Sequence, residues 1–98
     1  MIVERWAFGT KDGCWGKMIE LLKTRREQSE RRFEILTCRF GAHNAQIVTE
    51  LRFESMAEME KFWDGFGSTP EERDFLEKFQ AFGSDSTWAN HEVWNVIE

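Results

Sequence analysis

The sequence predicts an α+β domain in which a four-stranded antiparallel sheet carries helices on one face. Alternating side chains mark strands at residues 2–8, 32–40, 46–54 and 91–97. Apolar residues at i, i+3, i+4 spacing mark helices after the first and third strands. Capping residues and glycines then mark where the later helices begin and end. The 98 residues contain no linker, so we expect a single domain over residues 1–98.

The first strand and the helix after it follow from local composition. Residues 2–8 are rich in branched and aromatic side chains, and the turn "GTKDG" ends them. The helix stripe consists of Trp15, Met18, Ile19 and Leu22. This helix fades in a charged stretch near Ser29.

A hairpin is predicted in the middle of the chain. Residues 32–40 alternate, and Cys38 is interpreted as a small core residue of this strand. The turn "GAHNA" contains Gly41 and Asn44, which tolerate positive φ. Residues 46–54 alternate most regularly, with Ile47, Thr49, Leu51 and Phe53 on one side.

Two capped helices follow the hairpin. Ser55 with Glu58 and Thr69 with Glu72 are capping boxes, and Pro70 suits a first helical turn. Gly67 and Gly83 are natural ends for the two helices. The apolar stripes are Met59, Phe62, Trp63 and Phe66, and then Phe75, Leu76, Phe79 and Phe82.

The resulting βαββαβ order is the ferredoxin-like arrangement, which leaves one sheet face without helices. In a lone domain that face should be polar. In either register of the first and last strands it carries apolar residues, including Trp94 with Val96 or Val93 with Ile97. We therefore expect a homodimer through the sheet face.

Composition narrows the partners and the compartment. A net charge of −5 and an interrupted basic stretch argue against nucleic acid as a partner. Cys14 and Cys38 are too far apart for a metal motif, so we expect no metal and reduced thiols in a cytoplasmic protein. We expect no membrane span, and Glu4 and Arg5 interrupt the apolar core of a signal peptide.

The layout resembles the dimeric α/β-barrel superfamily, in which two ferredoxin-like sheets pack into one barrel. The first strand is similar to that of NIPSNAP-type domains: Glu4 matches, Trp6 and Phe8 replace an Arg and a Tyr, and "KDG" matches the turn. Antibiotic-biosynthesis monooxygenases share this fold, bind their substrates between sheet and helices, and in some members oxidise them without metal or flavin, so the resemblance implies a substrate site in that place. Related haem-degrading enzymes use an Asn, a Trp and a His. Trp63 could match that Trp, but the first strand has no Asn and no His lies between Trp63 and His91, which disfavours haem degradation.

Four residues are the candidate ligand-binding set. Trp6 and Trp63 are interpreted as aromatic walls of a cavity or, alternatively, as core. His91 and Asn95 share a strand face, where they either line a pocket or bond backbone and water. His43, at a turn, is interpreted as solvated. The catalytic residues are unknown.

The remaining polar groups have structural interpretations beside functional ones. The strand charges are Glu4, Arg39, Glu50, Arg52 and Glu92. They are expected to form ion pairs, although a buried glutamate among them would be a candidate base. Cys14 opens a helix, whose dipole could lower the pKa of its thiol.

Two functions from different classes remain. One is a small dimeric α/β-barrel protein that binds a small, partly apolar organic molecule and needs no cofactor, with monooxygenase or isomerase activity. The alternative is a non-catalytic dimeric structural or ligand-sensing module. RNA binding shares the strand order, but the third strand "QIVTELRFE" lacks the required Gly-aromatic-Gly run.

Overall fold

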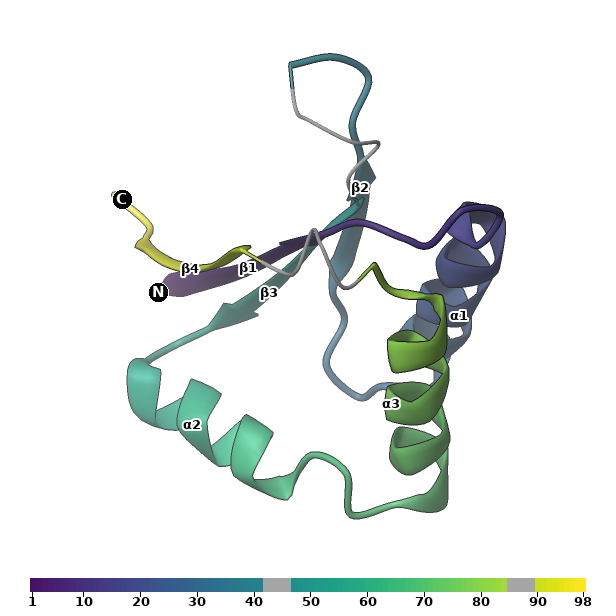
Figure 1. Cartoon of the computed structure of the whole chain (residues 1–98). Helices are drawn as coiled ribbons and strands as arrows, with labels where there is room; N and C mark the ends of the chain where they lie inside the picture. The colour runs from purple at the N-terminus through teal and green to yellow at the C-terminus, as the bar shows by residue number, and fades with distance from the viewer. Residues whose placement is uncertain (42–46, 85–89) are drawn as a thin grey trace.

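The strands and helices form in the predicted order. The computed structural model describes residues 1–41, 47–84 and 90–98. The elements are β1 (Ile2–Phe8), α1 (Trp15–Gln28), β2 (Glu34–Thr37), β3 (Ile47–Phe53), α2 (Met56–Gly65), α3 (Pro70–Phe82) and β4 (Asn90–Asn95). The four strands make an antiparallel sheet in the order β2-β3-β1-β4, which confirms the α+β ferredoxin-like prediction (Figure 1).

The register of the sheet settles which side chains face the helices. Trp6 lies opposite both Thr49 and His91, and Glu4 lies opposite Leu51 and Val93. Residues directly opposite one another project from the same face. The helix-facing side therefore carries Ile2, Glu4, Trp6 and Phe8 of β1, Ile47, Thr49, Leu51 and Phe53 of β3, and His91, Val93 and Asn95 of β4.

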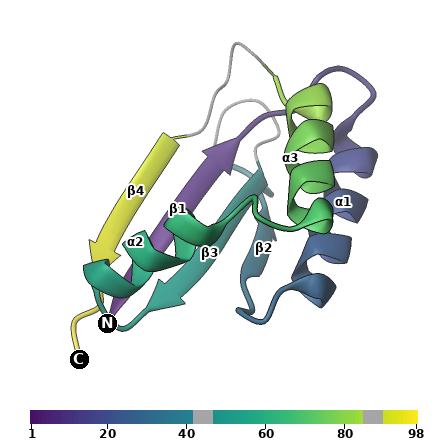
Figure 2. The same cartoon turned by 90° about the horizontal axis from the view of Figure 1, so that it is seen from below.

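The three helices lie on that side in two groups. In Figure 2, α2 lies across β1 and β3, while α1 and α3 lie side by side near the other end of these strands. Two buried clusters follow this division. One, beneath α2, contains Ile2, Phe33, Leu51, Phe53 and Met59. The other, beneath α1 and α3, contains Phe8, Met18, Leu22 and Ile47.

The helix ends follow the predicted capping chemistry. The Thr69 side chain accepts from the Glu72 backbone N–H and Glu72 bonds back, so this capping box is complete. Ser55 accepts from the Glu58 N–H, but the Glu58 carboxylate reaches the N–H of Glu54 instead of closing the box. Pro70 is the first residue of α3.

Two details differ from the prediction, and one predicted residue cannot be compared. The second strand ends at Thr37, so Cys38 lies beyond it and is exposed, and its interpretation as a core residue is wrong. Trp15 is 44% exposed, because the buried stripe of α1 consists instead of Met18, Leu22 and Arg25. His43 lies outside the described residues.

The outer face of the sheet mixes apolar and charged groups. Leu36 and the Trp94 ring are exposed there, and Arg5 bonds Glu50 with its Nε 2.8 Å from Oε2. Among the described residues no helix is long and apolar enough to span a bilayer.

Candidate functional site

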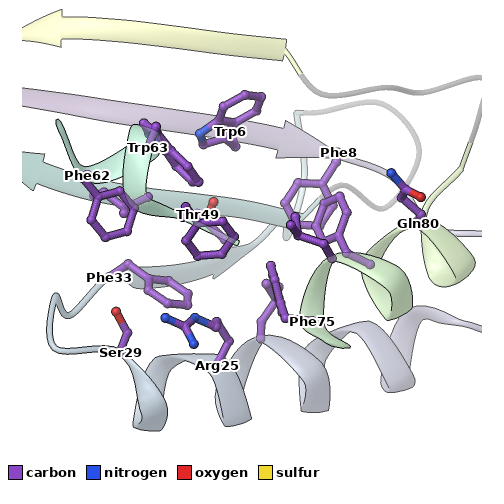
Figure 3. A pocket seen from close by; sticks show the side chains of 15 residues that line it. Trp6, Phe8, Arg25, Ser29, Phe33, Thr49, Phe62, Trp63, Phe75 and Gln80 are labelled. Carbon is purple, nitrogen blue, oxygen red and sulfur yellow. The ribbon is translucent and has the colours of Figure 1, made fainter. Parts of the chain in front are cut away.

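A pocket of about 210 Å³ lies between the sheet and all three helices. Its floor is formed by the helix-facing side chains of β1 and β3, and its walls by aromatic rings (Figure 3). The lining residues are Trp6, Phe8, Leu22, Arg25, Ser29, Phe33, Thr49, Leu51, Phe62, Trp63, Phe66, Phe75, Leu76, Phe79 and Gln80. A mostly apolar concave site with a few polar groups is typical of small-molecule binding.

The walls are a continuous series of ring contacts. Going from α2 to α3, the ring centroids of Phe62 and Trp63 are 4.9 Å apart, those of Trp63 and Phe66 5.2 Å, and those of Phe66 and Phe75 6.2 Å. Phe75 then contacts Phe79 at 5.8 Å. These rings are only half-buried, because they border the pocket instead of packing fully against the sheet.

Trp6 and Trp63 meet at one side of the pocket. Their centroids are 6.1 Å apart with the planes at 72°, an edge-to-face arrangement. The Trp6 indole nitrogen is buried and has no hydrogen-bond acceptor among the described residues. A buried donor without a partner is uncommon and is often found where a protein binds something further.

Glu4 joins these rings to β4. Its side chain is 1% exposed. One carboxyl oxygen accepts the Trp63 indole N–H at 2.7 Å, and the other lies 2.7 Å from His91 Nε2. The His91 ring also stacks on Trp6, with centroids 3.9 Å apart. A buried carboxyl group thus fixes both a pocket ring and an imidazole that is 39% exposed.

The opposite side of the pocket is formed by α1. Figure 3 shows Arg25, on α1, and Ser29, directly after its C-terminal end, across the pocket from Trp6 and Trp63. The Arg25 guanidinium is buried, lies over the Phe66 ring at 5.4 Å and faces Glu72 Oε2 at 3.6 Å. That separation is longer than a hydrogen bond.

Glu72 is held by its own helix terminus. Burial raises its pKa, but N–H groups of Thr69 and Gly67, the Thr69 side chain and the nearby Arg25 charge outweigh burial. The pKa of Glu72 therefore lies below its ordinary value of 4.5, and the carboxylate is ionised at neutral pH.

The four residues predicted to bind a ligand do not all lie at the pocket. Trp6 and Trp63 line the pocket. His91 contacts Trp6 and Glu4 but is not among the described residues that line it, and Asn95 lies exposed at the far end of β4, opposite Ile2.

Sequence reasoning missed Arg25 and treated Glu4 only as one of several strand charges. Arg25 follows Leu22 by three residues, so the spacing of the apolar stripe could have shown that it faces inward. The partners of Glu4 lie 59 and 87 residues away, and no local pattern indicates them. Within the described residues, no group of three or more His, Cys, Asp or Glu is placed to hold a metal ion.

Comparison with known proteins relates this architecture to solved structures. No family model and no curated protein matches the chain. An uncharacterised NIPSNAP domain protein from Burkholderia xenovorans superimposes with a TM-score of 0.74 at 13% identity, covering 99% of this chain and 95% of that one. The two chains share one fold, which is ferredoxin-like.

Two further solved structures are similar to this chain in fold. A provisionally named antibiotic biosynthesis monooxygenase from Nitrosomonas europaea gives a TM-score of 0.75 at 12% identity, with both chains covered completely. Another of that name from Deinococcus radiodurans gives 0.66 at 9% identity, covering 100% of this chain and 94% of that one. The predicted likeness in fold to NIPSNAP-type and monooxygenase-type domains is confirmed; at these identities the likeness extends to the fold alone.

Proposed function

We propose that the protein is a homodimer that binds a small, partly apolar organic molecule in the pocket between its sheet and helices. The observation that carries this proposal is the aromatic pocket itself. For comparison, an apolar cavity of about 150 Å³ holds one benzene ring. The pocket of about 210 Å³ therefore suits one ring with a short substituent.

Binding can be tested by isothermal titration calorimetry with a panel of neutral, anionic and cationic single-ring compounds. Leu76→Trp, on the wall that α3 contributes, should fill the pocket and abolish binding, because Leu76 is only partly covered and tolerates a larger ring. Leu21→Trp, on α1 outside the pocket lining, is the matched control. A panel in which nothing binds the folded wild-type protein would overturn the proposal.

The dimer part of the proposal rests on the outer sheet face. Trp94 is 55% exposed there, and Leu36 is exposed on the same face. An exposed apolar surface on the sheet face that carries no helices is suited to a self-complementary contact. A second copy of the sheet would bury these side chains beside the Arg5–Glu50 ion pair.

Light scattering after size exclusion, over a range of concentrations, measures the assembly directly. Wild-type protein should be a dimer. Trp94→Glu should give a monomer, since it places a charge in the interface. Trp15→Glu, the same change on the exposed side of α1, should remain dimeric. A monomeric wild-type protein would refute this part of the proposal.

A catalytic form of this function would use the Glu4–His91 contact, which adjoins the pocket through Trp6 and Trp63 and is not part of its lining. A carboxyl group within 2.7 Å of an imidazole is the arrangement that moves protons in many sites. An isomerase would take a proton from one ligand carbon and return it to another. A cofactor-free monooxygenase would consume dioxygen, converting a ligand methylene to a carbonyl with release of water.

Two readouts separate these outcomes. Deuterium exchange at a ligand C–H in D₂O, followed by NMR, reports proton abstraction, and an oxygen electrode reports oxygenation. His91→Gln should abolish either activity while ligand binding persists. A bound ligand that neither exchanges nor reacts would identify a non-catalytic binding or sensing module.

A further inference from the structure

The chemical class of the ligand can be narrowed from the charges around the pocket. Arg25 is a buried cation on a wall that is otherwise mostly apolar. Burying a guanidinium costs free energy unless its N–H groups are bonded. Glu72 supplies charge, but at 3.6 Å it is beyond hydrogen-bond distance, and its other oxygen accepts from the N–H groups of Gly67 and Thr69.

A second hollow adjoins the pocket at this side. It is an open groove lined by Arg25, Ser29, Glu30, Arg31, Arg32, Arg52 and Phe62. Arg25, Ser29 and Phe62 also line the aromatic pocket, so the two hollows meet at these residues. The groove brings together four arginines and one acidic residue, although the chain carries a net charge of −5.

The arginines of this groove keep a positive surplus after their own ion pairs are counted. Arg31 is paired with Glu58 and also donates to the carbonyl oxygen of Arg52 at 2.7 Å. Arg25 faces Glu72. The side chains of Arg32 and Arg52 are exposed and outnumber the single acidic residue of the lining, Glu30. A groove in which positive charge predominates attracts small anions.

We propose that the ligand is an aromatic carboxylate, whose ring occupies the pocket and whose carboxylate binds Arg25 at the junction with the arginine-lined groove. This inference rests on the proposed binding function and deepens it. A guanidinium presents a planar set of donors that matches a carboxylate, and the surrounding apolar rings would strengthen that contact by excluding water. Ser29 lies at the same junction, but its hydroxyl already donates to the carbonyl oxygen of Arg31 and accepts from the Arg31 N–H.

The test compares two ligands of the same shape and different charge. Calorimetric titration with 3-phenylpropionate and with 3-phenylpropanamide should show the carboxylate binding at least about tenfold more tightly, the difference typical of a charge-assisted hydrogen bond. Raising the salt concentration should weaken carboxylate binding more than amide binding.

Variants assign the preference to Arg25. Arg25→Gln combined with Glu72→Gln removes both charges together, so no uncompensated charge remains, and glutamine can still accept the Gly67 and Thr69 N–H groups. This double variant should bind acid and amide equally. Glu72→Gln alone should bind the carboxylate more tightly than wild type, because the competing carboxylate is gone.

A matched pair of surface variants tests the groove. Arg32→Gln should weaken carboxylate binding roughly threefold, since Arg32 is exposed and screened by solvent. Arg39→Gln removes an equally exposed arginine outside the groove lining and should leave binding unchanged.

The outcomes separate this inference from the binding function on which it rests. Preferential carboxylate binding that the double variant abolishes supports both. Equal binding of acid and amide, or binding of only neutral or cationic rings from the panel, overturns the carboxylate assignment and leaves the binding function in place. If no ring compound binds the folded wild-type protein, both are refuted.

Discussion

The two halves of the helical layer pack differently against the sheet. Beneath α1, the side chains of Met18, Leu22 and Ile47 are fully or almost fully buried. Along α2 and α3, the rings from Phe62 to Phe79 contact one another and remain half-buried, and α3 contributes no buried residue. The side chains beneath α1 belong to a close-packed core, whereas the rings on the pocket side of α2 and α3 form a wall around the pocket.

This difference separates stability from binding. Close-packed side chains stabilise a fold, because each buried methylene leaves water and contacts neighbours on all sides. Rings that border a hollow give up part of that stabilisation and present surface to a ligand. Substitutions of close-packed core residues should therefore act mainly on stability, and substitutions of the wall rings and of Arg25 mainly on binding.

The largest expected effect is Leu22→Ala in the α1 half. Leu22 is 2% exposed and belongs to the cluster of Phe8, Met18 and Ile47. Its truncation should lower the free energy of unfolding by about 2–5 kcal/mol. Urea denaturation followed by circular dichroism measures this. A loss below about 1 kcal/mol would mean that the α1 half is not the stabilising core.

A smaller loss of stability is expected where α2 is joined to the sheet through Glu4. Glu4→Ala leaves the Trp63 indole N–H and the His91 imidazole without their partner. The free energy of unfolding should fall by about 1–3 kcal/mol. Glu4→Gln keeps a carbonyl oxygen that can accept the Trp63 N–H, so its free energy of unfolding should fall by less than that of Glu4→Ala. Equal stability of all three proteins would show that this network does not hold the wall to the sheet.

The sequence predicted most of the fold because its information is local. Strand alternation, the capping residues Ser55 and Thr69, and the stripe of α2 each depend on residues a few positions apart. The end of β2 was misplaced because side-chain alternation continues through Cys38, whereas the strand ends at Thr37. Local patterns do not specify where a strand ends.

The candidate site was predictable only in part. Trp6 and Trp63 could be named, because large rings on facing elements are natural cavity walls. The contacts of Glu4 could not, because they depend on how three distant segments meet. Arg25 was hidden in a run of charged residues that resembles a solvated helix end. The burial of one arginine in such a run depends on α3 packing beside α1.

A substitution in the ring wall should change ligand binding more than stability, which is the reverse of what is expected for the core. Phe66→Leu keeps an apolar side chain of similar volume, so the free energy of unfolding should change by less than about 1.5 kcal/mol. Loss of its ring contacts with Trp63 and Phe75 should weaken binding of 3-phenylpropionate by about 3- to 10-fold. Calorimetry and urea denaturation on the same sample compare the two effects. A variant that loses stability but binds normally would reverse the assignment of roles.

The smallest effect concerns the carboxylates that begin α2 and α3. The pKa of Glu58 is lowered by the Glu54 N–H and by the Arg31 side chain, and the pKa of Glu72 also lies below 4.5 although burial raises it. A group whose pKa is lower in the folded state stabilises the protein above its unfolded value. That stabilisation is lost as the pH falls below 4.5 through the folded-state pKa.

Glu72→Gln should therefore be less stable than wild type at neutral pH, and the two should converge in acid, once the pH has fallen below the lowered pKa of Glu72. Urea denaturation at several pH values measures the difference, with Glu77→Gln as control, since Glu77 is an exposed carboxylate on the same helix. A gap between Glu72→Gln and wild type that persists in acid would mean that Glu72 acts by packing and not by charge. In that case Arg25 would not be held by an ionised partner, and the contrast between a core that stabilises and a wall that binds would need no electrostatic contribution from Glu72.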